Sequence, residues 1–392
     1  TGISTYFYLF LRCYRLSCQS FKQTATVPTS GPCVHTLVSN GRTLERAAGI
    51  AAMVPETMKA VVVRKLGDAS VLSVEDNFPT PSLQQNHVLV KNELIGLNFI
   101  DTYYRSGLYK KDLPFVSGQE GGGKVVAISP DAQKSGIVVG DTVVYMSFGS
   151  YAEFCLVPVD KMVKVPDGVD MGTAVACMTQ GLTAHYLVTD AHAGLLGEGE
   201  WCLIYSVGSG TCQWAAQMAK IRGYRVIGTT SEGKKDVAKE AGCDELIVLD
   251  EAHDGSYADY ASVDILAKVM EITGGQGVKA IIDGVGMSTT EISLSCLARR
   301  GIFISFGNAS GAVPSFPVLR LTPKSAFVTR PKLGDYIATR EELDGRCRDV
   351  FNWLKDGKLR LGIDTVFQLD KAAEGHEYLE SGKSRGKVLL KI

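Results

Sequence analysis

Short apolar runs separated by glycine and proline mark the first part of the chain after Met58. Strands are expected at residues 59–64, 88–92, 122–128 and 141–146. Short strands with turn residues between them are typical of a β-rich, barrel-like unit rather than of a parallel sheet. This part of the chain should therefore form a β-rich domain.

The hydrophobic period changes near residue 171. Residues 171–188 have the spacing of a helix, and from Trp201 apolar strands alternate with amphipathic helices. We expect strands at 201–207, 224–229, 246–249, 280–283 and 301–306, and helices at 213–221, 233–241, 263–273 and 289–298. Such alternation gives a parallel sheet with helices on both faces. The sequence thus predicts an α/β, doubly wound nucleotide-binding fold, and a last strand at 387–392.

These patterns divide the chain into three parts. Residues 1–57 are set apart as a disordered or transit-like leader, 58–180 with 320–392 form the β-rich domain, and 181–319 form the nucleotide-binding domain. The leader is basic and rich in Ser and Thr, which is typical of an organelle transit peptide. Upstream sequence outside the fold would look the same, since Met53 or Met58 could be the initiator. We expect a cytoplasmic protein, or a mitochondrial one if the leader is a real transit peptide.

The composition of the 392 residues narrows the classes of partner. The chain is 45% hydrophobic and 21% charged with a formal net charge of −1, so nothing favours nucleic acid or an anionic membrane surface. No apolar run approaches the roughly 20 residues that span a bilayer. The 10 cysteines include no C-x-x-C pair. That pattern is typical of buried, reduced thiols rather than of a disulfide framework or a zinc knuckle.

A glycine turn between an expected strand and an expected helix is the clearest chemical motif. Gly208, Ser209, Gly210 and Thr211 stand where the free N–H groups of a helix N-terminus would hold a pyrophosphate. The usual third glycine is missing, because Cys212 stands in that region. A plain tight turn would have a similar sequence, but the surrounding strand–helix–strand order favours a cofactor site.

The residues after the second strand of this unit indicate which nucleotide binds. An NAD site needs an acid ~20 residues beyond the glycines. Hydroxyl groups and lysines stand there instead, Ser231 and Lys234 among them, and these would hold the 2′-phosphate of NADPH. Glu232 is the exception, and Lys234 with Lys235 could equally form a solvated helix face. We expect NADPH as the cofactor.

Several segments, taken in order, carry a family signature. They are NFIDTY at 98–103, RSGLY at 105–109, GLT at 181–183, QWA at 213–215, VIGT at 226–229, SFGNASG at 305–311 and VTRP at 328–331. Together they resemble the zinc-free quinone oxidoreductases, the zeta-crystallin-like branch of the medium-chain dehydrogenase/reductase superfamily. The resemblance runs from about Met58 to the C-terminus. It implies a Rossmann nucleotide domain, a GroES-like catalytic domain, and a homodimer or homotetramer with residues 301–306 as the candidate sheet edge at the interface.

The same resemblance bears on the metal. Zinc alcohol dehydrogenases of the superfamily bind their catalytic metal with a Cys and a G-H-E motif. The corresponding positions here look like Asn98 and the run Gly118, Gln119, Glu120, and the four-cysteine structural zinc lobe is absent. Amides in place of a thiolate and an imidazole remove the ligands that zinc prefers. We therefore expect no metal.

The resemblance also implies a role for individual residues, each of which could instead be a core or turn residue. The expected catalytic residues, lining the nicotinamide and substrate cleft, are Asn98, Asp101, Tyr103 and Tyr109. The expected cofactor-binding residues are Gly181 and Thr183 at the domain junction, Gly208, Ser209, Gly210 and Thr211 at the pyrophosphate, Ser231 and Lys234 at the 2′-phosphate, and Phe306, Gly307, Asn308 and Arg330 at the nicotinamide end. The family often has a cofactor-stacking tyrosine where Leu249 stands here.

The chemistry then favours one reaction. Without a metal, an alcohol is hard to dehydrogenate at neutral pH, whereas an electron-poor quinone accepts hydride readily. We expect an NADPH:quinone oxidoreductase with a small-molecule quinone as its partner, in which Tyr103 or Tyr109 could donate a hydrogen bond to the developing oxyanion. Two alternatives stay open. One is a zinc-free NADPH-dependent reductase of enone or alkenal double bonds, and the other is a non-catalytic, crystallin-like protein that binds NADPH or RNA.

Overall fold

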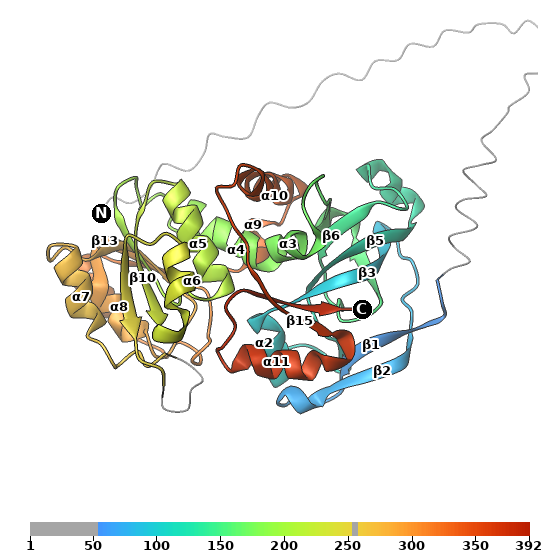
Figure 1. Cartoon of the computed structure of the whole chain (residues 1–392), viewed down its shortest axis with the longest axis horizontal. Coiled ribbons are helices and arrows are strands. Elements are labelled where there is room, and N and C mark those ends of the chain that lie inside the picture. The colour runs from blue at the N-terminus through green and yellow to red at the C-terminus, as the bar shows by residue number, and fades with distance from the viewer. Residues whose placement is uncertain (1–53, 253–257) are drawn as a thin grey trace, which may run out of the picture. The chain divides into compact units, whose positions relative to one another are not determined.

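Three β-sheets and the helices around them account for most of residues 54–252 and 258–392, the part of the chain that the computed structural model describes (Figure 1). These sheets belong to one compact unit, which takes in all of the described residues. The transit-peptide prediction concerns residues 1–57, nearly all of which lie outside the described residues.

The first part of the described chain is β-rich, as its short apolar runs predict. A three-stranded sheet has the order β2–β1–β4, and a larger one has the order β15–β16–β3–β5–β6–β8, with β7 paired to β3. The strands are β1 (Thr57–Val63), β2 (Leu72–Pro79), β3 (His87–Leu97), β4 (Phe115–Val116), β5 (Glu120–Ile128), β6 (Thr142–Met146), β7 (Phe154–Pro158), β8 (Met162–Lys164), β15 (Ile363–Gln368) and β16 (Lys387–Lys391). The C-terminal β16 pairs antiparallel with β3, so the end of the chain returns beside residues 94–97.

Six parallel strands form the third sheet, in the order β11–β10–β9–β12–β13–β14. They are β9 (Trp201–Ile204), β10 (Arg225–Ser231), β11 (Glu245–Leu249), β12 (Val278–Asp283), β13 (Leu297–Ser305) and β14 (Phe327–Thr329). The connecting helices are α5 (Gly210–Ile221), α6 (Lys235–Glu240), α7 (Ile265–Ile272) and α8 (Thr290–Cys296). This strand order confirms the predicted doubly wound fold.

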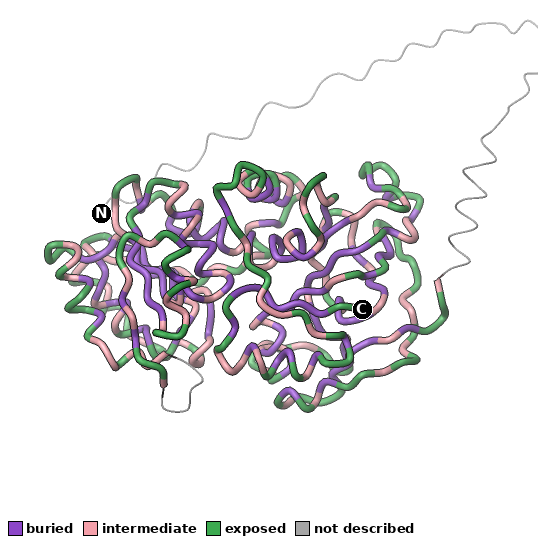
Figure 2. Tube along the Cα trace, in the orientation of Figure 1, coloured by how far each residue is buried: buried purple, intermediate pink, exposed green. Residues whose placement is uncertain are grey.

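Both faces of this sheet are covered, because neighbouring residues of a strand point to opposite sides. Ile204 and Ile282 belong to one buried cluster, whereas Leu203 and Ile281 belong to another. Figure 2 shows these strands as a buried layer between more exposed helices. Near-continuous apolar strands are what a parallel sheet buried on both sides requires.

One prediction about this sheet is wrong. The resemblance implies residues 301–306 as the candidate sheet edge at an interface, but β14 covers β13 and is itself the edge strand. The helix predicted at 289–298 is confirmed as α8, although it ends at Cys296 and β13 already starts at Leu297. A strand as short as β14 has too few residues to show a hydrophobic period, so only the fold reveals it. β14 also lies beyond residue 319, so the sheet continues past the predicted end of the nucleotide domain; the remaining domain limits stay predictions.

One bent helical segment joins the β-rich part to the parallel sheet. It consists of α3 (Met171–Ala176), a π-helical turn (Cys177–Gly181) and α4 (Leu182–Thr189), and it confirms the helix predicted at 171–188. The C-terminal tail adds α9 (Leu333–Tyr336), α10 (Arg340–Lys355) and α11 (Ala372–Glu380), and α10 packs on α4. Single-turn π-helices often lie at functional sites, and this one leads from one sheet to the other.

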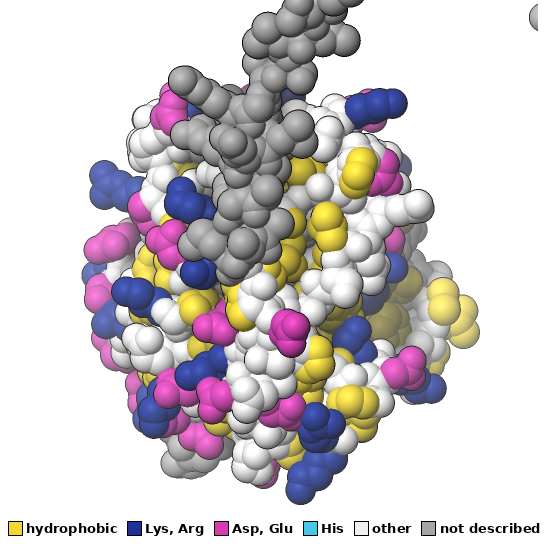
Figure 3. Space-filling view, turned by 90° about the vertical axis from the view of Figure 1, so that its right-hand side faces the viewer, with side chains coloured by type: hydrophobic (Ala, Val, Ile, Leu, Met, Phe, Trp, Pro, Cys, Tyr) yellow, Lys and Arg dark blue, Asp and Glu magenta, His cyan; other side chains and the backbone are white. Residues whose placement is uncertain are grey.

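The structure also shows how the cysteines, the apolar residues and the charged residues are distributed. The cysteines within the described residues are all free thiols, six of them buried and Cys243 half-buried. None of the described helices combines the length and the apolar character needed to cross a membrane. On the face drawn in Figure 3, basic and acidic side chains alternate without a large patch of either sign.

Candidate active site

A cavity of about 930 Å³ lies between the β-rich part and the parallel sheet. It is lined from the β-rich side by residues of α2 (Phe99–Ser106) and from the other side by the loops that follow β9, β10 and β12. Ligands of doubly wound folds bind beyond the carboxyl ends of the strands. This cavity is in that position.

The predicted glycine turn forms one wall of the cavity. Helix α5 begins at Gly210 with Ser209 as its N-cap, yet the Ser209 side chain does not cap the helix. Its hydroxyl donates instead to the carbonyl oxygen of Ser206 at 2.8 Å. Gly210, Thr211 and Cys212 line the cavity, so the first N–H groups of a twelve-residue helix have no side-chain cap there. An anion is the natural partner of such groups.

The turn has no space for a side chain at Gly208. A Cβ atom at Gly208 would lie 2.6 Å from the Cβ of Lys234 and 3.0 Å from the hydroxyl oxygen of Thr230. The turn and the end of β10 thus approach each other closely, and they leave room for a ligand only without a side chain at this point. On the other side, the buried Oε1 of Gln180 has no hydrogen-bond partner within the described part of the chain.

Basic and hydroxyl groups gather at the end of the cavity beyond β10. Ser231 and Lys234 line it, as the sequence predicts, and so do Lys383 and Ser384. The Lys234 ammonium donates to the carbonyl oxygen of Ser384 at 2.7 Å. Burial lowers the pKa of Lys234 to about 8. In its charged form, this partly desolvated ammonium would interact strongly with an anion bound in the cavity.

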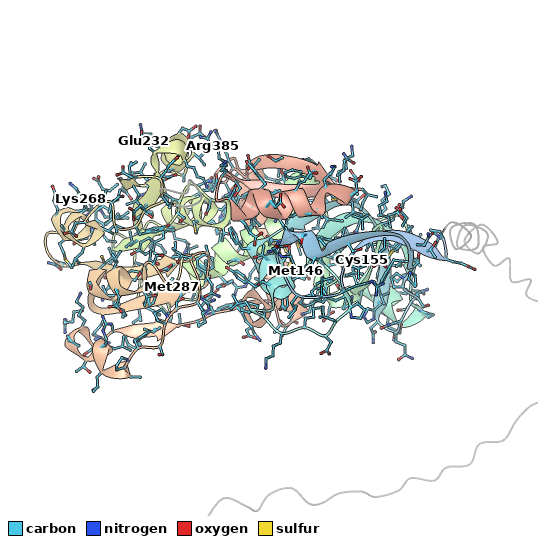
Figure 4. The ribbon with its side chains drawn as sticks, turned by 90° about the horizontal axis from the view of Figure 1, so that it is seen from below. Met146, Cys155, Glu232, Lys268, Met287 and Arg385 are labelled. Carbon is cyan, nitrogen blue, oxygen red and sulfur yellow. The ribbon has the colours of Figure 1, made fainter. Side chains whose placement is uncertain are left out.

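The two nearby acids differ in position. Glu232 does not line the cavity; its carboxylate pairs with Lys235 at 3.1 Å and is largely exposed. In Figure 4 it is labelled near Arg385, which is paired with Asp236. Glu251, two residues after β11, does line the cavity. Glu251 was not among the expected site residues, although its place just after an expected strand was a signal.

An aromatic ring also reaches this end of the cavity. Leu249, at the position where the family often has a tyrosine, is buried in the core with 1% exposure. Tyr260 lines the cavity instead, and its hydroxyl lies 2.7 Å from the hydroxyl of Ser206. Tyr260 stands eleven residues after the end of β11, so strand spacing could not place it.

The opposite end of the cavity is aromatic. Tyr103, Tyr104, Tyr109 and Phe148 all line it, with ring centroids 5.1–5.7 Å apart in edge-to-face pairs. Aromatic rings in this arrangement offer flat apolar surfaces together with hydroxyl donors. Phe306 and Gly307 line the neighbouring wall.

Behind this wall lie two residues that the sequence predicts in the site. The Arg330 guanidinium donates to the carbonyl oxygen of Gly307 at 2.9 Å and to the Tyr109 hydroxyl at 3.4 Å. The backbone N–H of Asn308 donates to the Tyr103 hydroxyl at 3.1 Å. Neither residue lines the cavity itself.

Asn98 lines the cavity at the start of α2 and belongs to a buried polar cluster. Its side-chain oxygen accepts from the Lys387 ammonium at 2.8 Å, and its side-chain nitrogen donates to Glu120 Oε1 at 2.7 Å. The Lys387 ammonium and Glu120 Oε1 form an ion pair at 2.5 Å, in which both side chains are 0% exposed. Asn98 and Glu120 belong to motifs visible in the sequence, whereas Lys387 lies 267 residues from Glu120 and no motif marks it.

Asp101 lies beneath this cluster rather than in the cavity. Its Oδ2 accepts from the Asn98 backbone N–H at 2.9 Å and from the Tyr151 hydroxyl at 3.0 Å. Burial raises the pKa of Asp101 to about 7. Gly181, at the end of the π-helical turn, also does not line the cavity, whereas Thr183 does. The structure thus gathers the other predicted site residues around one cavity and leaves Asp101, Gly181, Asn308 and Arg330 behind its walls.

The structure bears on the metal through the residues that would hold one. Within residues 54–252 and 258–392, no three His, Cys, Asp or Glu side chains are placed to hold a metal ion together. Asn98, at one of the two positions that resemble zinc ligands, instead accepts a hydrogen bond from the ammonium of Lys387, which Glu120 shares.

Two family models match the chain. The alcohol dehydrogenase GroES-like domain matches residues 84–167, and the zinc-binding dehydrogenase model matches residues 249–390.

The chain matches individual relatives over nearly the whole length of those relatives. The quinone oxidoreductase of Pseudomonas aeruginosa is 36% identical over 337 residues, which is 85% of this chain and 99% of the relative. Quinone oxidoreductase 1 of Escherichia coli is 35% identical and covers 83% of this chain and 97% of its own. Among solved structures, the Escherichia coli quinone oxidoreductase complexed with NADPH has a TM-score of 0.79 at 34% identity, with 85% of this chain and 100% of that chain covered. A mycobacterial protein solved with NADPH gives 0.79 at 37% identity, covering 86% and 100%.

Proposed function

Because the chain belongs to the zinc-free quinone oxidoreductases of the medium-chain dehydrogenase/reductase superfamily, we propose that it reduces quinones with NADPH. The observation that carries this proposal is the cavity, which has the glycine turn and Lys234 at one end and aromatic rings beside Asn98 at the other. A cofactor as long as a dinucleotide needs both ends of such a cavity.

The chain's own residues fit NADPH. Gly208, Ser209, Gly210 and Thr211 would hold the pyrophosphate at the uncapped start of α5, and Ser231 and Lys234 would hold the 2′-phosphate. Thr183, Phe306 and Gly307 would flank the nicotinamide. When bound, NADPH supplies the hydride; the quinone accepts it with one proton and leaves as a hydroquinone.

The protein's contribution is then to position the quinone and to exclude water. The rings of Tyr103, Tyr104, Tyr109 and Phe148 would hold a planar acceptor, and the Asn98 amide or a tyrosine hydroxyl would donate to the oxygen that gains charge. Arg330 supports this end by holding the Gly307 carbonyl and the Tyr109 hydroxyl. Asp101, Gly181 and Asn308 would act through their neighbours rather than by touching a ligand.

Steady-state kinetics test the proposal. We expect higher kcat/KM with 1,4-benzoquinone and 1,2-naphthoquinone than with an alkenal, and higher values with NADPH than with NADH. If the alkenal is reduced as fast as the quinones, the enzyme is a double-bond reductase instead. If NADPH binds but neither acceptor reacts, the catalytic proposal is wrong.

Lys234→Ala should lower the affinity for NADPH roughly tenfold and leave that for NADH unchanged, because a charge-assisted bond to phosphate is lost. Fluorescence titration with each nucleotide measures both constants. Lys235→Ala is the matched control, since the neighbouring Lys235 is half-buried, does not line the cavity and pairs with Glu232. If Lys234→Ala prefers NADPH over NADH as strongly as the unmodified protein does, Lys234 does not bind the 2′-phosphate.

The preference for NADPH should also depend on pH. Burial holds the pKa of Lys234 at about 8, so the ammonium is present at pH 7 and increasingly lost above pH 8. Because only the ammonium attracts the phosphate, the ratio of NADH to NADPH dissociation constants should fall between pH 7 and pH 9.5. The same titration of Lys234→Ala should give a ratio that does not change with pH.

We also propose a homodimer in which two copies of β14 meet at the edge of the parallel sheet. An edge strand carries unpaired backbone groups. Around it, Phe327 and Val328 are 44% and 39% exposed, and Val318 and Leu319 are 77% and 80% exposed. A self-complementary apolar edge of this kind is typical of a two-fold interface. The cytoplasmic location stays a prediction.

Phe327→Asp should convert the dimer to a monomer, because two carboxylates would then be buried beside the two-fold axis. Light scattering coupled to size-exclusion chromatography gives the mass directly. Val138→Asp is the control, since Val138 is 56% exposed and lies outside this patch. A monomeric unmodified protein, or a Phe327→Asp protein that stays dimeric, would contradict the proposal.

A further inference from the structure

A buried ion pair lies directly behind the substrate end of the cavity. Lys387 comes from β16 and Glu120 from the start of β5, and neither side chain is exposed to solvent. The ammonium has three acceptors, one for each proton: Glu120 Oε1, the side-chain oxygen of Asn98 at 2.8 Å and the carbonyl oxygen of Leu97 at 2.9 Å. It is therefore fully bonded without a ligand.

Glu120 is held as firmly as its partner. Its Oε1 accepts from Lys387 and from the Asn98 side chain, and its Oε2 accepts from the backbone N–H of Thr179 at 2.6 Å. That N–H belongs to the π-helical turn. Gly96 makes room for the carboxylate, because a Cβ atom there would overlap Oε1. Three separate elements thus fix this side chain.

The pair leaves the Asn98 carboxamide only one orientation. An ammonium can only donate and a carboxylate can only accept. The Asn98 oxygen must therefore face Lys387, and its nitrogen must face Glu120. Glu120 takes one of the two amide hydrogens, and the described part of the chain offers no hydrogen-bond acceptor for the other. Asn98 is one of the residues that line the cavity.

We propose that Lys387 and Glu120 are positioning residues that fix the Asn98 carboxamide so that it donates an N–H to the carbonyl oxygen of the substrate. This inference rests on the proposed function, because a quinone carbonyl is the group that would accept the bond as hydride arrives. A buried ion pair is often no more stable than a pair of apolar residues of similar size. Stability alone therefore does not account for this ion pair, whereas a role in orienting Asn98 does.

A set of three variants tests the proposal in the full-length enzyme. Asn98→Ala removes the donor, Glu120→Gln/Lys387→Met removes both charges while keeping the volume, and the triple variant combines them. We expect Asn98→Ala to lower kcat for 1,2-naphthoquinone roughly 100-fold, as the loss of an oxyanion donor does. The charge-free pair should lower kcat by at least about tenfold with little change in the NADPH dissociation constant. The triple variant should be no slower than Asn98→Ala, because the pair acts only through that amide.

The outcomes separate this inference from the proposed function. An unmodified enzyme that does not reduce quinones refutes the proposed function, and this inference with it. An active enzyme whose charge-free pair keeps its kcat, or whose triple variant loses the product of the two separate losses, refutes this inference alone. A crystal structure of the unmodified enzyme with NADP⁺ and a hydroquinone is independent of the folding of any variant. It should show the hydroquinone oxygen on the Asn98 side-chain nitrogen, and an oxygen bound only to another donor such as Gln119 would overturn the inference.

Discussion

Replacing Lys387 by methionine should lower the free energy of unfolding by about 3–5 kcal/mol. Lys387→Met keeps the length of the side chain but removes the only cation paired with Glu120 among the described residues. The carboxylate would then lie fully buried without a counter-charge, and the Leu97 carbonyl and the Asn98 side-chain oxygen would lose their donor. Leaving one member of a buried pair uncompensated is among the most destabilising single changes in a protein. Urea unfolding followed by fluorescence measures the loss.

Two further variants identify the cause. Glu120→Gln/Lys387→Met removes both charges and should recover much of the stability lost in Lys387→Met. Lys358→Met is the matched control, because Lys358 pairs with Asp356 while both side chains are more than half exposed. Such surface pairs contribute about 0–1 kcal/mol. If Lys387→Met unfolds at the same urea concentration as the unmodified protein, the buried pair does not contribute as described.

The second large effect concerns Gly208. Gly208→Ala should weaken the binding of NADPH roughly 100-fold. The added methyl group would lie 2.6 Å from the Lys234 Cβ, an atom close to the backbone that cannot move aside as the end of a flexible side chain could. The new atom would push apart the turn and the end of β10, which together line the phosphate end of the cavity. Fluorescence titration measures the affinity.

The pattern across nucleotides distinguishes this variant from Lys234→Ala. Gly208→Ala should weaken NADH and NADPH alike, because both cofactors carry the pyrophosphate, whereas Lys234→Ala should affect NADPH alone. Gly345→Ala is the control, since a Cβ atom at Gly345 in α10 would meet no atom within 4 Å. It should keep nucleotide affinity and raise stability by up to about 1 kcal/mol through helix propensity. If Gly208→Ala binds NADPH as tightly as the unmodified protein, the assignment of the turn to the cofactor site is wrong.

Local sequence patterns predicted the structure correctly wherever a single segment of the chain contains all the residues that determine it. The strand–helix alternation after Trp201 predicted the doubly wound sheet, because each strand carries its own apolar run. The turn at 208–211 and the helix at 171–188 were likewise legible, since glycine and hydrophobic spacing act over a few residues. The order of several motifs indicated the family, and the relatives at 34–36% identity confirm it.

Contacts between distant segments were not legible in the same way. Lys387 meets Glu120 and Asn98 only because β16 returns to pair with β3, and no local pattern marks a lysine as buried. Tyr260 and Glu251, which follow β11 in the chain, line the cavity, whereas Leu249, at the position of the family tyrosine, is buried in the core. Such contacts depend on strand order, which a linear pattern does not contain.

The alternating strands and helices of the nucleotide fold, the glycine turn and most of the expected site residues followed from hydrophobic period, turn chemistry and motif order, and those residues do line the cavity. Only the tertiary structure shows which strand is the free edge, which acid lines the cavity and which cation lies beside Asn98. Each of those depends on how the chain closes upon itself: β14 covers β13, Glu251 turns inward, and β16 carries Lys387 back to the start of α2.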